Sequence, residues 1–320
     1  MIPIYYTDRL LEYKGRFPDV PERLTSILKY LQGSELKYKV VGPRRAKDED
    51  LLRAHDELYL KELKEYKRIN SYFPDEPIDA KTYEVTKWSA GAAISAAKAS
   101  KKGFAFALTR PKGNNAGHNF FGNFSYVNNM AVAILNIMDR YDRILIIDFD
   151  AHFCNGTYDI LKDEEKVSIL SIHQHAESVY PYIGREREST PRALFIENRL
   201  WITDGEYLDR FRGHIPKFVE KVKPDLIGVS AGFNIFHKDV FFGTVSNITN
   251  PMTFGQVGRL LSIEAERVGA DIFGVLEGGY WLDDLGKLVC NFLKGFEREV
   301  LPDVVSDGDV PRKDKEDSER

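Results

Sequence analysis

Short apolar runs rich in β-branched residues recur along this chain, and segments of helical periodicity lie between most of them. A continuous apolar run of this length is typical of a strand that is buried on both faces of a sheet. Strands that alternate with helices predict βαβ units, and therefore a largely parallel sheet. The runs are FAFAL at 104–108, RILIID at 143–148, VSILSIH at 167–173, ALFIE at 193–197, LIGVSA at 226–231 and IFGVLEGG at 272–279.

Three segments are predicted to be helices. Residues 24–31 place Leu and Ile at i, i+3, i+4 and i+7, behind a capping-box pattern formed by Asp19 and Glu22. Residues 207–222 carry aromatic and aliphatic side chains on one stripe, and residues 125–138 are apolar nearly all round, which predicts a buried helix.

Composition limits the class of protein. With 320 residues, of which 43% are hydrophobic, the chain can bury one large α/β core, expected over residues 1–300, while the charged segment 301–320 is expected to be a disordered tail. The formal charge of −4 gives no sign of nucleic-acid binding. Two cysteines cannot build a disulfide framework, and charges interrupt the first ten residues. We therefore expect a cytoplasmic protein without a membrane partner.

Polar side chains follow one of the predicted strands at regular spacing. Asp148, Asp150 and His152 stand at i, i+2 and i+4 within the segment ILIIDFDAHFCNGT, residues 144–157. Because side chains alternate along an extended strand, all three face one side, at the point where the apolar run stops. This pattern is typical of metal ligands at the end of a strand in an α/β sheet, but an isolated string of this kind also fits a surface acidic cluster with a hydrogen-bonded His.

Seven segments carry recognisable motifs in a fixed order: FPDVPERL at 17–24, LLRAHDELYL at 51–60, TRPKGNNAGHNFFGNFSYVNN at 109–129, IDFDAHFCNGT at 147–157, SIHQHAESVYPYIG at 171–184, SAGFN with a following Asp at 230–239, and LEGGY at 276–280. Together they resemble the histone deacetylase family, including its bacterial and archaeal acetoin-utilisation and acetylpolyamine-deacetylase-like members. The resemblance implies the arginase/deacetylase fold, a three-layer αβα structure with a single, mostly parallel sheet of about eight strands.

The resemblance also implies a zinc position. In zinc-dependent members, the second Asp and the His of D-x-D-x-H and the Asp of SAGFD bind the metal, so Asp150, His152 and Asn234 hold this position here. Asn234 stands where the family has a carboxylate, and an amide oxygen offers zinc a dipole in place of a charge. We expect zinc to bind weakly or not at all.

The catalytic positions carry over in part. Two tandem histidines serve the family as general base and electrostatic partner, and Asn114 and Asn115 occupy their places. An Asn side chain cannot take a proton from an attacking water, and a missing general base costs about 10²–10⁴ in rate. Tyr280 matches the tyrosine that polarises the substrate carbonyl in the family. We therefore expect a degenerate active site.

The resemblance assigns a substrate pocket as well. Phe124 and Tyr180 match the aromatic walls of the family's acyl-lysine channel, Arg23 matches a buried arginine at its foot, and Gly278 and Gly279 precede the catalytic tyrosine position.

The resemblance also implies an inner potassium or sodium site, formed by the Asp148 carboxylate, the backbone carbonyls of Asp150 and His152, and the turn at Ser171 and Ile172. Such carbonyls point inward and need a partner.

Three further side chains could substitute for the lost groups. His118 can be proposed as a base, and His237 or Cys154 as a metal ligand, but a structural role is favoured for each. Lys112 stands where the family has Pro, and a solvated loop charge is favoured over a cation at the pocket rim.

We therefore favour a member of the deacetylase superfamily that has lost ordinary zinc-dependent deacetylase activity and keeps a binding, regulatory or assembly role, with a small acylated molecule or a protein as partner. The alternative is a rewired, metal-dependent amide hydrolase acting on a non-peptide C–N bond, which retention of Tyr280, Asp150 and His152 favours. A third interpretation, a ureohydrolase with two manganese ions, is disfavoured because that site needs several more carboxylates than these strands supply.

Overall fold

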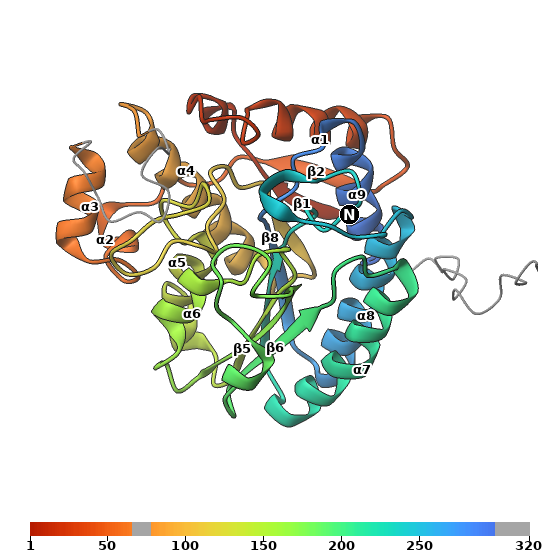
Figure 1. The fold of residues 1–320 in the computed structure, drawn as a ribbon. Coiled ribbons are helices and arrows are strands. Elements are labelled where there is room, and N and C mark those ends of the chain that lie inside the picture. The colour runs from red at the N-terminus through yellow and green to blue at the C-terminus, as the bar shows by residue number, and fades with distance from the viewer. Residues whose placement is uncertain (66–77, 298–320) are drawn as a thin grey trace, which may run out of the picture.

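The computed structural model describes residues 1–65 and 78–297, so the predicted tail at 301–320 lies outside the described residues. One eight-stranded sheet forms the centre of the molecule, in the order β2-β1-β3-β8-β7-β4-β5-β6, and all its pairings are parallel (Figure 1). The strands are β1 (Ile2–Tyr5), β2 (Tyr38–Val41), β3 (Ala105–Ala107), β4 (Ile144–Asp148), β5 (Val167–Gln174), β6 (Ala193–Asn198), β7 (Leu226–Ala231) and β8 (Asp271–Leu276).

Helices cover both faces of the sheet and complete a three-layer αβα arrangement (Figure 1). On one side, α4 packs on β1, β3 and β8, and α5 packs on β7 and on α4. On the other side, α7 packs on β4 and β5, and α8 lies between α7 and α9. The helices are α1 (Glu22–Gln32), α2 (Asp48–Leu51), α3 (Glu57–Lys64), α4 (Thr82–Ala99), α5 (Asn129–Leu135), α6 (Asn155–Leu161), α7 (Asp204–Val222), α8 (Met252–Val268) and α9 (Leu282–Lys294).

The six predicted strands are confirmed as β3 to β8. Every residue of β3, β4, β5 and β7 is buried, which explains their continuous apolar sequences, because helices cover both faces. The prediction missed β1 and β2. β2 forms the edge of the sheet and all its residues are partly or fully exposed, so the apolar signal used to find the other strands is weak there.

The helix predictions are confirmed for α1 and α7 and corrected in detail. Asp19 does not cap α1, because the helix begins after Pro21 without a side-chain cap. The Asp19 carboxylate instead accepts a hydrogen bond from Arg23 at 2.7 Å. The helix predicted over 125–138 is wrong in length, because α5 covers only 129–135. Asn128 caps it by accepting the N–H of Ala131, so this side chain starts the helix instead of interrupting it.

The topology brings the predicted site together. The carboxyl ends of β3, β8, β7, β4 and β5 are neighbours in the sheet, and the loops that follow them carry the polar motifs found in the sequence. In open parallel sheets ligands bind outside these ends, where loops from several strands meet.

Candidate functional site

Asp150, His152 and Asn234 meet at the carboxyl ends of β4 and β7, and all three side chains are buried. The Asn234 amide nitrogen lies 2.9 Å from Asp150 Oδ1 and 3.2 Å from His152 Nδ1. The third side, between Asp150 Oδ1 and His152 Nδ1, is also 3.2 Å. The three side chains predicted at the zinc position therefore form a closed triangle of polar atoms.

The orientation of the Asn234 amide decides what this triangle can bind. Its oxygen accepts the backbone N–H of Ala151 at 3.0 Å, which turns the NH₂ group toward Asp150 and His152. Its two N–H donors can serve the Asp150 oxygen and the His152 Nδ1 lone pair at once. A zinc ligand must offer a lone pair, whereas this NH₂ group offers hydrogens. The donor set therefore does not fit zinc. Within residues 1–65 and 78–297, no cluster of three or more His, Cys, Asp or Glu residues is placed to hold a metal ion.

Two glycines let the strands approach this site closely. The second oxygen of Asp150 accepts the N–H of Gly278 at 2.8 Å. A Cβ at Gly278 would lie 2.4 Å from the Asn234 amide nitrogen and 2.6 Å from Asp150 Oδ2. Gly279 adopts φ +127°, a backbone conformation that residues with a side chain rarely adopt. The pair lies where the resemblance placed it, beside Tyr280, and allows the β8 loop to touch the triangle.

Asn114 and Asn115 hold a buried cation. The ammonium of Lys112 donates to Asn114 Oδ1 at 2.7 Å and to Asn115 Oδ1 at 2.5 Å. The amide of Asn114 also donates to Asp148 Oδ2 at 3.1 Å. Lys112 is fully buried, so the interpretation of this residue as a solvated loop charge is wrong.

The charge of Lys112 reaches two neighbouring carboxyl groups. Burial disfavours ionisation of Asp150, but the Lys112 ammonium and the hydrogen bond from the Asn234 amide help to outweigh it and hold the pKa of Asp150 well below its usual range. Burial raises the pKa of Glu277 to about 7, and Lys112 moderates this shift. The prediction did not include Glu277, whose Oε2 accepts the N–H groups of the loop after β3.

Arg23 and Tyr280 lie on the far side of the β8 loop. The guanidinium of Arg23 donates to the carbonyls of Gly279 at 2.6 Å and Glu277 at 2.5 Å. It also stacks 4.7 Å from the centre of the Tyr280 ring. The Tyr280 hydroxyl is buried without a hydrogen-bond partner among the described residues, and so is Nε2 of His152.

Aromatic rings cover these two polar groups. Phe124 and Tyr180, the predicted pocket walls, are buried; Phe124 lies 5.9 Å from the Tyr280 ring and Tyr180 6.5 Å from the His152 ring. Phe242, which the prediction did not include, contacts the rings of Phe124 at 5.3 Å, His152 at 6.4 Å and Tyr280 at 6.0 Å.

Phe242 lies in a strained backbone conformation, with φ +59°, which is uncommon for a bulky residue. It is 36% exposed, while the rings it contacts are buried. Phe242 therefore lies between solvent and the side chains of His152 and Tyr280. This position could not be predicted from the sequence, because positive φ at an aromatic residue cannot be read from composition.

The predicted inner cation site is assembled by strand register. Asp148 on β4 pairs with Ser171 on β5 and with Ser230 on β7. Ser171 Oγ contacts Nδ1 of His173 at 2.9 Å, and Ser230 Oγ is buried with no partner among the described side chains. Burial and the neighbouring carboxyls of Asp150 and Glu277 raise the pKa of Asp148 well above its usual value. Occupation of this site by potassium or sodium stays a prediction.

The side chains weighed as substitutes do not join the triangle. His118 is exposed, and the ring of His237 contacts the Ile248 carbonyl at 3.0 Å. Cys154 is buried near the inner site, and burial raises the pKa of its thiol well above the usual value, which opposes the thiolate needed for metal binding. Structural roles therefore suit all three.

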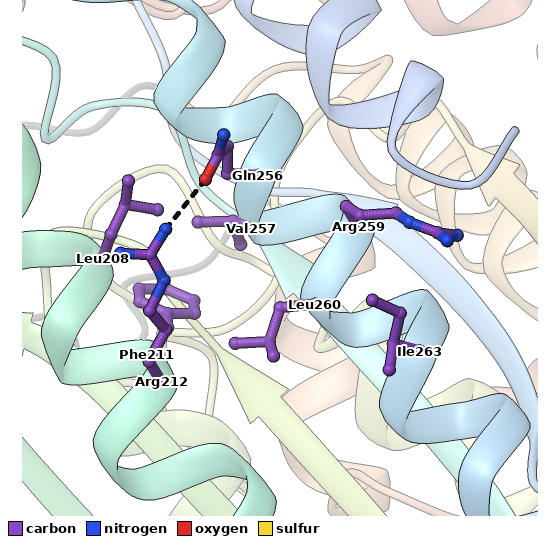
Figure 2. A pocket seen from close by; sticks show the side chains of 8 residues that line it. All are labelled: Leu208, Phe211, Arg212, Gln256, Val257, Arg259, Leu260 and Ile263. Atoms are coloured by element: carbon purple, nitrogen blue, oxygen red, sulfur yellow. Dashed lines mark hydrogen bonds between the residues drawn. The ribbon is translucent and has the colours of Figure 1, made fainter. Parts of the chain in front are cut away.

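A separate pocket of about 200 Å³ lies between α7 and α8 (Figure 2). Arg212 turns toward Gln256 and donates a hydrogen bond to it, whereas Arg259 points away from this pair. The residues that line it are Leu208, Phe211, Arg212, Gln256, Val257, Arg259, Leu260 and Ile263. None of these residues is a carboxylate or a histidine, so this pocket offers no metal ligand or general base of those types. No helix among the described residues has the length and apolar character needed to span a bilayer.

Comparison with known proteins places this geometry in a family. The profile of the histone deacetylase domain matches residues 17–296. A probable deacetylase of Methanothermobacter thermautotrophicus is 28% identical over 299 residues, covering 90% of this chain and 88% of the relative. Acetylpolyamine amidohydrolase 1 of Pseudomonas aeruginosa is 26% identical, covering 87% of this chain and 91% of the relative.

The fold agrees with solved structures. The crystal structure of acetylpolyamine aminohydrolase from Burkholderia pseudomallei superposes with a TM-score of 0.81 over 92% of this chain and 98% of that chain, at 21% sequence identity. The predicted arginase/deacetylase fold, with a single parallel sheet of eight strands, is therefore confirmed.

Proposed function

Because the chain belongs to the histone deacetylase family, whose profile matches residues 17–296, we propose that it keeps the family pocket for a binding, regulatory or assembly role and has lost ordinary zinc-dependent deacetylase activity. The observation that carries this proposal is the Asn234 amide, whose NH₂ group, and not its oxygen, faces Asp150 and His152. A ligand set that offers hydrogens to the metal position does not support zinc chemistry.

The residues at the general-base positions also support a loss of deacetylase activity. Asn114 and Asn115 have no titratable group near neutral pH, and the oxygens of both side chains accept hydrogen bonds from the Lys112 ammonium. A water attacking an amide would find no proton acceptor there. This arrangement supports binding without hydrolysis.

The pocket suits a small acylated molecule or an acylated side chain of a protein partner. Tyr280 Oη and His152 Nε2 are buried and lack partners among the described residues, so both are available to a carbonyl oxygen. Phe124, Tyr180 and Phe242 supply an apolar surface for the aliphatic part of such a ligand. Two free, buried cysteines suit a reducing compartment, and we place this role in the cytoplasm.

A second candidate function is a rewired, metal-dependent amide hydrolase acting on a small acylated substrate. The retained Tyr280 hydroxyl favours it, because a binding module has no need of a group that stabilises an oxyanion. Relatives named as amidohydrolases favour it as well.

One assay separates the two functions. Purified protein is incubated with acetylpolyamines and acetyl-lysine peptides, with zinc, iron or cobalt added, and released acetate is measured. We expect negligible turnover, together with saturable binding of an acylated ligand that Tyr280→Phe weakens. Turnover near one per second that disappears in Tyr280→Phe would establish the hydrolase instead.

A further inference from the structure

Lys112 is a buried cation without a carboxylate in direct contact. Its ammonium is held by two neutral amide oxygens, those of Asn114 and Asn115, and its side chain is fully buried. Among residues 1–65 and 78–297, no carboxylate oxygen lies within 4.0 Å of this ammonium. A buried charge is costly unless its surroundings compensate it, so a lysine placed here needs an explanation beyond packing.

The surroundings provide that compensation at longer range. The carboxyl groups of Asp148, Asp150 and Glu277 are all fully buried in the same part of the molecule. The Lys112 charge helps to hold the pKa of Asp150 low and limits the rise that burial causes in the pKa of Glu277. The ammonium thus provides positive charge to a cluster of buried acidic groups.

The triangle formed by Asp150 Oδ1, His152 Nδ1 and the Asn234 amide nitrogen has the dimensions of a metal site but different chemistry. Its sides measure 2.9, 3.2 and 3.2 Å. Ligand atoms on a tetrahedral zinc, with bonds of 2.0–2.1 Å, stand about 3.3 Å apart. In this chain the Asn234 amide forms hydrogen bonds to Asp150 Oδ1 and His152 Nδ1, the two atoms that a metal ion would otherwise hold together.

A half-turn of the Asn234 amide would not restore the metal site without cost. It would point the oxygen at Asp150 and His152, but it would leave the backbone N–H of Ala151 facing an NH₂ group. A buried N–H without an acceptor is strongly disfavoured. The oxygen would also be brought toward a carboxylate that now receives a hydrogen bond.

We propose that Lys112 and Asn234 are a built-in replacement for a divalent metal: the Asn234 amide joins Asp150 to His152, the Lys112 ammonium supplies the positive charge, and the pocket is complete without a metal ion. This inference deepens the proposed binding function and rests on it. It concerns how the pocket is held together, whereas the proposed function concerns turnover.

Zinc binding and thermal unfolding test the proposal without reference to activity. Wild-type protein, Asn234→Asp and the double variant Asn234→Asp/Lys112→Met are titrated with zinc by calorimetry, and their unfolding midpoints are compared in zinc and in chelator. We expect no stoichiometric zinc on the wild type and a midpoint that zinc shifts by less than about 1 °C. The double variant should bind one zinc per chain at least about 1,000-fold more tightly, and zinc should raise its midpoint by several degrees.

The nearly isosteric Asn234→Asp keeps the experiment decisive if the double variant does not fold, because a gain of at least about tenfold in zinc affinity is expected from the added ligand charge alone. The control Asn247→Asp/Lys238→Met makes the same charge change at two exposed residues and should gain nothing.

Two outcomes would overturn the proposal: one zinc per wild-type chain with a Kd below micromolar, or no gain in either variant. Turnover by metal-free wild-type protein would instead refute the proposed function and leave this inference standing.

Discussion

Arg23 and Lys112 are both fully buried cations beside the loop that follows β8, yet they are held in different ways. Arg23 forms an ion pair with Asp19 at 2.7 Å and donates to two backbone carbonyls, so every partner is fixed by the fold. Lys112 donates to two amide oxygens and faces its carboxylates only at longer range. The first cation ties α1 to the β8 loop, and the second sets the charge of a pocket.

The largest expected effect is on the structural cation. Arg23→Met removes the closer of the two ion pairs of Asp19, which keeps Arg110 at 3.5 Å, and leaves two buried carbonyls without their donor. We therefore expect a loss of about 3–5 kcal/mol in the free energy of unfolding. Urea denaturation measures it. Arg9→Met, which removes an exposed pair with Glu12, is the control and should change little. Equal losses in the two variants would refute the structural role of Arg23.

The carboxyl group of Asp239, near Arg23, should make stability depend on pH. Burial raises its pKa to about 7, although hydrogen bonds from the Tyr280 and Trp281 backbone and the charge of Arg23 oppose the shift. The folded state therefore holds this proton more tightly than the unfolded chain. The resulting stabilisation is complete below about pH 4 and is lost as the pH rises through 7.

Between pH 5 and pH 8 we expect the wild type to lose roughly 2–3 kcal/mol more than Asp239→Asn, as measured by urea denaturation at each pH. Asp209→Asn, at an exposed position, serves as the control. A wild type whose stability rises over this interval as much as that of Asp239→Asn would contradict the prediction.

A smaller effect is expected at the pocket cation. Lys112→Met leaves Asn114 Oδ1 without its donor, while Asn115 Oδ1 keeps the hydrogen bond from the Asn123 amide. The change should cost about 1–3 kcal/mol, partly offset because burying a lysine is itself unfavourable. Urea denaturation of both variants compares this loss in the free energy of unfolding with that of Arg23→Met. A loss as large as that of Arg23→Met would mean that Lys112 is a structural tie of the same kind.

The smallest expected effect concerns the inner site of Asp148, Ser171 and Ser230. We propose that potassium or sodium binds there, and a site filled at several times its Kd adds about 1 kcal/mol, or a few degrees in the midpoint. Thermal unfolding in potassium, sodium and a large organic cation, at equal ionic strength, measures the difference, with Asp148→Ala as control. Identical midpoints in all three salts would exclude the cation.

The comparison also explains what the sequence could predict. Continuous apolar runs marked β3 to β8 because strands covered on both faces need such sequences. The motif residues Asp150, His152 and Asn234 were expected to meet, and they do, because they follow neighbouring strands. Their hydrogen-bond directions depend on the Ala151 N–H, which no side-chain pattern reveals.

Lys112 shows where reasoning from sequence stops. Between Pro111 and Gly113 it resembles a loop lysine, and its burial follows only from the position of Asn114 and Asn115 in the folded chain. Asp19 fails for a related reason. It matches a capping pattern, but its carboxylate is taken by Arg23, four residues further on, whose guanidinium is held by carbonyls of the β8 loop.

The position of Phe242 has a kinetic consequence. Its partly exposed ring contacts the buried rings of His152 and Tyr280, so we expect a ligand to reach their polar groups only while the Phe242 ring is turned aside. The association rate then scales with the fraction of time for which the ring is displaced, and the same ring delays escape once it has returned. Residence time and affinity thereby become separate properties of this pocket, with one aromatic side chain governing the first.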